Sequence, residues 1–147
     1  MNITSNGKYP SNKLSNFAGH RFTIDGVECY SMEGFLQSLK FKSPDMQKEV
    51  CKLVGIGAKK RGAGKNWNKT QTLHWQGTDY TRKGKEYQEL LDRAYLCMFE
   101  QSEGFRKALR ASLKSTLEHS IGRTKKSDTV LTRSEFCGRL TRLRDQL

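Results

Sequence analysis

The sequence predicts a single compact α+β domain that is mostly helical, with a few short strands arranged as hairpins. Its 147 residues are the length of one ordinary domain. Apolar residues recur at helical spacing over several long stretches. Strand-like alternation is confined to short segments beside two turn sequences. We find no internal repeat and no low-complexity segment that would divide the chain.

The N-terminal part combines a polar segment with a hairpin. Residues 1–13 are polar and turn-rich, and we expect a loosely held lead-in before a domain spanning residues 14–147. Apolar and polar residues then alternate over 22–29 around Asp25-Gly26, a dipeptide that favours a two-residue hairpin turn.

The next stretch, residues 31–41, has the pattern of a short helix with two distinct faces. Its apolar stripe is formed by Met32, Phe35, Leu36 and Leu39. Ser31 is a candidate N-cap, which places Glu33 in the first turn, where free backbone N–H groups favour a carboxylate. Glu33, Gln37 and Lys40 lie on an adjoining face. Such a face is either an ordinary surface stripe or the start of a site.

Pro44 suits the first turn of a second helix, which is expected to end near Gly55. Residues 55–69 then interleave glycines with cations and contain no acid. We interpret them as a loop, either solvated and flexible or built to bind an anion. It is not a Walker loop, because Asn66 follows Gly64-Lys65 where Ser or Thr is required.

The second half of the chain is predicted from similar local signals. A second hairpin is expected over 72–81, the longest helix over 83–101, a further helix over 105–113 and a short strand over 116–121. Thr132 and Glu135 have the spacing of a capping box that begins the last helix. In that helix we expect Arg139 and Arg142 to face outward.

The composition restricts the class of protein. A formal net charge of +12 indicates an anionic partner such as phosphate, nucleotide or nucleic acid. The four cysteines are widely spaced and the three histidines stand apart, so we expect neither a disulfide framework nor a metal site. No apolar run approaches the length of a membrane span, and no signal-peptide core is present. We expect a cytoplasmic protein without a cofactor or a membrane partner.

Three motifs in close order resemble the NADAR family, whose name derives from NAD and ADP-ribose. They are Leu14-Ser15-Asn16-Phe17, the Asp25-Gly26 hairpin, and Ser31-x-Glu33-x-x-x-Gln37-x-x-Lys40-Phe41. Residues 116–120 resemble the Leu-Val-Glu-His segment of the family, and Asp128 stands where the family carries an acid. The chain departs from the family at Ala63, where Arg usually follows Gly, and at Val130-Leu131, where many members have Trp-Gly.

The resemblance implies a hydrolase that cleaves the N-glycosidic bond of a phosphorylated ribosyl compound. The family includes an N-glycosidase of riboflavin-biosynthesis intermediates. Cleavage passes through an oxocarbenium-like state, which requires a carboxylate. Glu33 and Asp128 are the catalytic candidates. The candidate substrate-binding residues are Asn16, Phe17, Gln37, Lys40, Lys59, Arg61 and Trp75. Trp75 is preferred to Trp67 for stacking on a heterocycle, because it leads directly into the long helix.

The alternative is a non-catalytic protein that binds nucleic acid or nucleotide through its positive charge. The two hypotheses differ at Glu33, since a hydrolase needs this carboxylate and an electrostatic binder does not. Within the first hypothesis, the substrate remains open among free ADP-ribose compounds, ADP-ribosylated DNA, ADP-ribosylated protein and riboflavin precursors.

Overall fold

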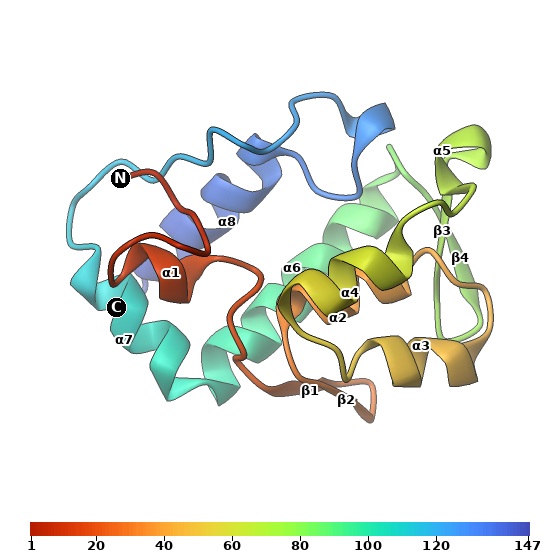
Figure 1. Cartoon of the computed structure of the whole chain (residues 1–147), viewed down its shortest axis with the longest axis horizontal. Helices are drawn as coiled ribbons and strands as arrows, with labels where there is room; N and C mark the ends of the chain where they lie inside the picture. The colour runs from red at the N-terminus through yellow and green to blue at the C-terminus, as the bar shows by residue number, and fades with distance from the viewer.

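Helix α6 (Lys85–Gln101) runs through the middle of the domain (Figure 1). The computed structural model describes all 147 residues. The helix contacts α2 (Met32–Ser38), α7 (Glu103–Ala111), α8 (Arg133–Arg144) and one strand of each hairpin. Its buried stripe is Tyr87, Leu90, Leu91, Ala94, Tyr95 and Met98. The predicted mostly helical α+β fold is confirmed.

Both predicted hairpins are present as separate two-stranded antiparallel sheets. Strand β1 (Phe22–Ile24) pairs with β2 (Val27–Cys29), and β3 (Thr72–Trp75) pairs with β4 (Thr78–Thr81). Asp25 and Gly26 have positive φ angles of 49° and 76°. Two such residues in succession match the right-handed twist of the paired strands, so the Asp-Gly signal identified the turn correctly.

Helix α2 begins where its N-cap predicts. The Ser31 hydroxyl accepts a hydrogen bond from the Gly34 N–H at 3.0 Å and donates to the Leu53 carbonyl at 2.9 Å. A Cβ at Gly34 would lie 2.6 Å from that same carbonyl, so the absence of a side chain lets α2 approach the chain after α3 (Pro44–Val50). Helix α2 is thereby fixed at its N-terminal end, next to Glu33.

The glycine-rich segment from residue 55 is a helix and not the predicted loop. Helix α4 (Gly55–Gly62) packs against α2, and the short α5 (Trp67–Thr70) follows it. Gly62 lies so close to Gln37 that any side chain there would overlap the amide. The glycine therefore allows two helices to approach closely, a role that sequence composition does not distinguish from loop flexibility.

The N-terminal residues are part of the domain and not a loosely held lead-in. Ile3 is completely buried, and its N–H donates to the Glu118 carbonyl at 2.8 Å. The short α1 (Ser11–Leu14) packs against α7. The strand predicted over 116–121 is reduced to a single bridge between Asn2 and Glu118.

The C-terminal helix confirms one prediction and corrects another. Thr132 and Glu135 form the expected capping box at the start of α8. Arg142 is exposed, but Arg139 is 5% exposed and points inward. Its guanidinium donates to the side-chain oxygen of Gln88 at 2.9 Å and forms an ion pair with Asp92 on α6. A buried arginine with such partners cannot be told from a surface one by helical spacing alone.

No helix is long and apolar enough to cross a membrane. All four cysteines are free thiols.

Candidate active site

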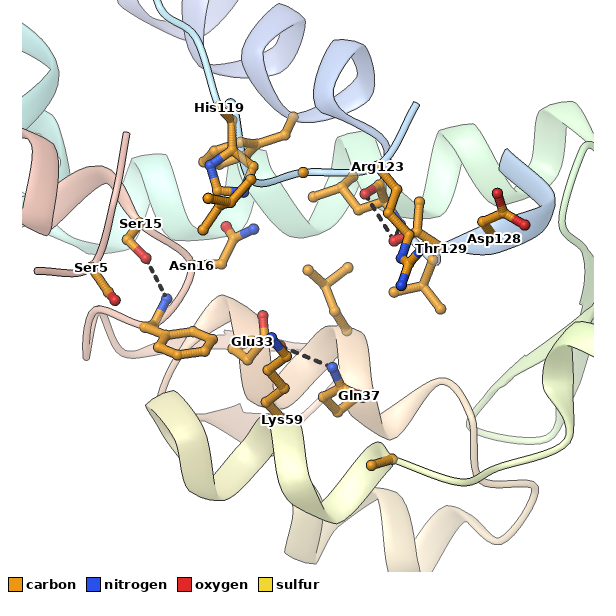
Figure 2. A pocket seen from close by; sticks show the side chains of 18 of the residues that line it. Ser5, Ser15, Asn16, Glu33, Gln37, Lys59, His119, Arg123, Asp128 and Thr129 are labelled. Atoms are coloured by element: carbon orange, nitrogen blue, oxygen red, sulfur yellow. Dashed lines mark hydrogen bonds between the residues drawn. The ribbon is translucent and has the colours of Figure 1, made fainter. Parts of the chain in front are cut away.

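A cavity of about 420 Å³ opens between helices α2 and α4 on one side and the chain from His119 to Leu131 on the other (Figure 2). The segment around Ser15–Phe17 closes one end. Most of the predicted site residues line this cavity, namely Asn16, Phe17, Glu33, Gln37, Lys40, Lys59 and Asp128.

Glu33 lies on the wall formed by α2, with its carboxylate held by Gln37. The Gln37 side-chain amide donates to Glu33 Oε1 at 2.9 Å, and the Glu33 backbone N–H donates to the Asn16 carbonyl at 3.0 Å. Burial raises the pKa of Glu33 above its usual value, and the Gln37 hydrogen bond and the nearby charges of Lys40 and Lys59 oppose that rise. A carboxyl whose pKa is raised in a cavity is suited to proton transfer.

Three cations face the cavity from both of its sides. Lys40 comes from the end of α2, and its Nζ donates to the Gly62 carbonyl at 3.5 Å. Burial lowers the pKa of Lys40, although the charge of Glu33 partly offsets this effect. Lys59 is exposed on α4, and Arg123 belongs to the facing segment. This arrangement favours an anionic ligand such as a phosphate.

Two of the predicted residues lie outside the cavity. Trp75 is buried beside Phe35, at 4.9 Å between ring centroids, and its indole N–H donates to Asp25 at 2.8 Å. Arg61 stacks over the ring of Phe41, 4.6 Å from its centroid. Trp67 is the tryptophan that lines the cavity, so the choice of Trp75 over Trp67 has no support in the geometry.

Asp128 lies on a cavity wall whose backbone carbonyls are held by hydrogen bonds from buried side chains. It ends the short 3-10 helix η1 (Lys126–Asp128), is exposed, and stands across the cavity from Asn16 in Figure 2. The carbonyl of the next residue, Thr129, accepts from Arg82 Nε at 2.7 Å, and Tyr87 donates its hydroxyl proton to the Val130 carbonyl at 2.7 Å. Asp128 has neither the burial nor the polar contacts of Glu33.

Sequence reasoning gave no role to two residues that line the cavity, His119 and Arg123. The Nδ1 of His119 lies 2.9 Å from the Ile3 carbonyl, and its ring meets Phe136 edge-on at 5.1 Å. The sequence signal for His119 is its place in residues 116–120, the segment that resembles Leu-Val-Glu-His of the family. No group of three or more His, Cys, Asp or Glu side chains comes together to hold a metal ion.

Gly62→Ala is expected to reduce turnover while Gly57→Ala on the same helix leaves it unchanged. The new Cβ at Gly62 would overlap Gln37 Oε1 and displace the amide that holds Glu33, whereas a Cβ at Gly57 meets no atom within 4 Å. Overpacking of this kind costs about 1–3 kcal/mol of stability. Steady-state rates and thermal unfolding of the two variants are the measurements. Equal rates for both would show that the Gln37 contact does not support Glu33.

The comparisons with known proteins identify the family. A family model described as bacteriophage protein GP30.3 matches residues 8–145. The 17.1 kDa protein encoded in the Gp30-rIII intergenic region of Enterobacteria phage T4 is 41% identical over 100% of this chain and 98% of its own length.

A solved structure supports the same assignment at the level of the fold. The NMR structure of the E. coli protein YbiA, a NADAR-family protein, matches with a TM-score of 0.62 over 99% of this chain and 83% of that chain, at 20% identity. The expected resemblance is thus confirmed. The chain belongs to the family of bacteriophage protein GP30.3, which is a NADAR-type family.

Proposed function

We propose that this protein hydrolyses the N-glycosidic bond of a phosphorylated ribosyl compound. Candidate substrates are ADP-ribosyl conjugates, including ADP-ribosylated nucleic acid, and riboflavin-pathway intermediates. The observation that carries the proposal is the position of Glu33: a half-buried carboxylate with a raised pKa, held by Gln37, in a cavity whose other charged groups are mainly cations. Membership of a NADAR-type family supports it.

The residues fit the charges that develop in such a reaction. The C1′–N bond breaks with its electron pair staying on nitrogen, positive charge builds up on the ribosyl ring, and water adds to C1′. The Glu33 carboxylate stabilises that positive charge and accepts the proton that water loses. The departing nitrogen takes up one proton, and Glu33 returns to its ionised form by releasing the proton that it accepted. Trp67 offers an aromatic surface to the leaving heterocycle, and Lys40, Lys59 and Arg123 attract the phosphates.

Lys59→Ala is expected to raise KM about 10-fold with little change in kcat, because attraction to a phosphate acts before and during the reaction. Arg61→Ala is the matched control, since Arg61 lies two residues away and stacks on Phe41 outside the cavity. The wild-type KM should also rise with salt, which screens exposed charges over about 8–10 Å at ordinary ionic strength. Equal KM values for both variants would remove Lys59 from the binding site.

Product analysis tests the proposal. The protein is incubated in parallel with ADP-ribosylated DNA, ADP-ribosylated protein, NAD and riboflavin precursors, and the products are identified by mass spectrometry. For at least one of them, the expected products are a sugar phosphate (ADP-ribose or ribose 5-phosphate) and the molecule that carried the nitrogen: unmodified DNA, unmodified protein, nicotinamide or the free pyrimidine. Cleavage of a phosphate ester or pyrophosphate, or no cleavage of any of the four, would refute the proposed activity.

A second candidate function is the binding of nucleic acid without catalysis. It is favoured by Lys60, Arg61 and Lys65, which are exposed on and just after α4, outside the cavity. Parallel assays of DNA binding and of product formation with Glu33→Gln separate the two functions. A hydrolase loses product formation in this variant, whereas a purely electrostatic binder forms no product in either protein and retains its whole affinity for DNA.

A further inference from the structure

We propose that Asn16 and His119 bind adjacent hydroxyl groups of a ribosyl ring, Asn16 as a hydrogen-bond donor and His119 as an acceptor. The cavity would thereby select ribose over 2-deoxyribose. The inference rests on the proposed function in taking a sugar as part of the ligand. Beyond that function, two side chains are assigned to bind the sugar hydroxyls, and neighbouring contacts determine which of them donates and which accepts.

Tyr95 determines which atom of the Asn16 side-chain amide faces the cavity. The Tyr95 hydroxyl lies 2.8 Å from Asn16 Oδ1, on a buried side chain of α6, and has no other hydrogen-bond partner. A buried hydroxyl must place its proton on an acceptor, so Oδ1 accepts that proton. The amide NH₂ of Asn16 is therefore left as a donor for the cavity, with no partner of its own.

The backbone carbonyl of Ile3 determines which ring nitrogen of His119 carries the proton. A carbonyl oxygen can only accept, so the Nδ1 that lies 2.9 Å from it carries the proton. In the neutral imidazole ring, Nε2 is then an acceptor. The carbonyl cannot move away readily, because Ile3 is completely buried and its own N–H is bonded to Glu118.

Both groups lie close to the carboxylate that the proposed reaction uses. Asn16 lies between His119 and Glu33 in Figure 2, and its backbone carbonyl accepts a hydrogen bond from the Glu33 backbone N–H at 3.0 Å. Glu33 Oε1 is bonded to Gln37, and Oε2 has no partner. The cavity wall therefore presents one donor, the Asn16 NH₂, between two acceptors, His119 Nε2 and Glu33 Oε2.

Two neighbouring hydroxyls match this order of donor and acceptors. One hydroxyl can accept from Asn16 and donate to Glu33, while the other donates to Nε2 of His119. A 2-deoxyribosyl ring lacks one of the hydroxyls, which leaves a polar group of the protein unpaired against an apolar carbon. A site built to bond a hydroxyl discriminates against the analogue that lacks it for this reason.

The test compares the binding of ribose 5-phosphate and 2-deoxyribose 5-phosphate by isothermal titration calorimetry. The wild type is expected to bind the ribose compound about 10-fold more tightly, which is the value of one good hydrogen bond.

His119→Asn keeps a donor for the Ile3 carbonyl but loses the acceptor at Nε2, and Tyr95→Phe releases the orientation of the Asn16 amide. A loss of the preference in either variant supports the inference. His74→Asn, on the β3–β4 hairpin outside the cavity, is the control and should keep the preference.

The inference is overturned by equal wild-type affinities for the two sugars, by no binding of ribose 5-phosphate at millimolar concentration, or by an unchanged preference in both variants. Neither sugar phosphate contains an N-glycosidic bond, so the result does not depend on turnover. Selective binding by a protein that cleaves no glycoside would leave the inference standing and refute the proposed function. Cleavage without any sugar preference would do the reverse.

Discussion

Glu33→Gln is expected to lower turnover by about 10²–10⁴-fold, the usual loss when a group that transfers a proton is removed. Folding should be preserved or slightly improved. The pKa of Glu33 is raised by burial, which means that ionisation of this side chain costs stability at neutral pH, and a neutral amide of the same shape avoids that cost. Binding of an anionic substrate should be equal or tighter, because a negative charge has left the cavity.

Glu118→Gln is the matched control, since Glu118 is exposed and its side chain does not line the cavity. Rates and melting temperatures of both variants are measured on the substrate found by product analysis. In the wild type, the rate should fall as pH drops through the raised pKa of Glu33, at a higher pH than an ordinary solvent-exposed carboxylate would give. Near-normal turnover by Glu33→Gln would reduce Glu33 to a residue that stabilises the start of its helix.

Arg82→Met is expected to cost about 3–5 kcal/mol of stability, the typical result of leaving one partner of a buried ion pair alone. Arg82 is completely buried and makes two hydrogen bonds to Glu135, at 2.6 and 3.1 Å. It also holds the Thr129 carbonyl on the wall of the cavity. The double variant Arg82→Met, Glu135→Gln should recover part of the loss, because the uncompensated charge is gone. Urea unfolding of the three proteins measures these differences.

The same ion pair predicts how stability depends on acid. Burial alone would raise the pKa of Glu135, but hydrogen bonds from Arg82, Thr132 and Gln88 together lower it to about 2. A carboxyl with a lowered folded-state pKa contributes stability above its unfolded pKa of about 4.5, and the contribution is lost as pH falls toward about 2. Its size is about 3 kcal/mol. The wild type should therefore lose stability across this window, and Arg82→Met should lose much less. Parallel acid dependences in the two proteins would contradict the role of the pair.

The features predicted correctly from the sequence are those fixed by neighbours along the chain. The Asp25-Gly26 turn, the Ser31 cap and the Thr132–Glu135 capping box each depend on residues no more than three positions apart. Glu33 and Gln37 were placed on one face by helical spacing, and that pairing is a hydrogen bond in the structure. Local stereochemistry is sufficient for such features, because the partner is already in reach.

The features that were missed depend on distant partners. The backbone N–H of Ile3 is bonded to the Glu118 carbonyl, and His119 acquires its orientation from the Ile3 carbonyl, more than a hundred residues away in sequence. The interpretation of residues 55–69 as a loop allows Lys59 and Arg61 to bind the same ligand. On a helix, residues two positions apart point in different directions, so only Lys59 lines the cavity.

The identity of the bond that breaks is the most direct test of the account. The substrate identified by product analysis is turned over in ¹⁸O-labelled water, and the products are weighed by mass spectrometry at early times. Sugar phosphate incubated with the protein in the same water corrects for spontaneous exchange at C1′. N-glycosidic hydrolysis is expected to place one ¹⁸O atom in the sugar product beyond that control, with none in the product that carried the nitrogen or in a phosphate. Label in a phosphate group, or a sugar product that gains no label beyond the control, would contradict N-glycosidic hydrolysis at Glu33.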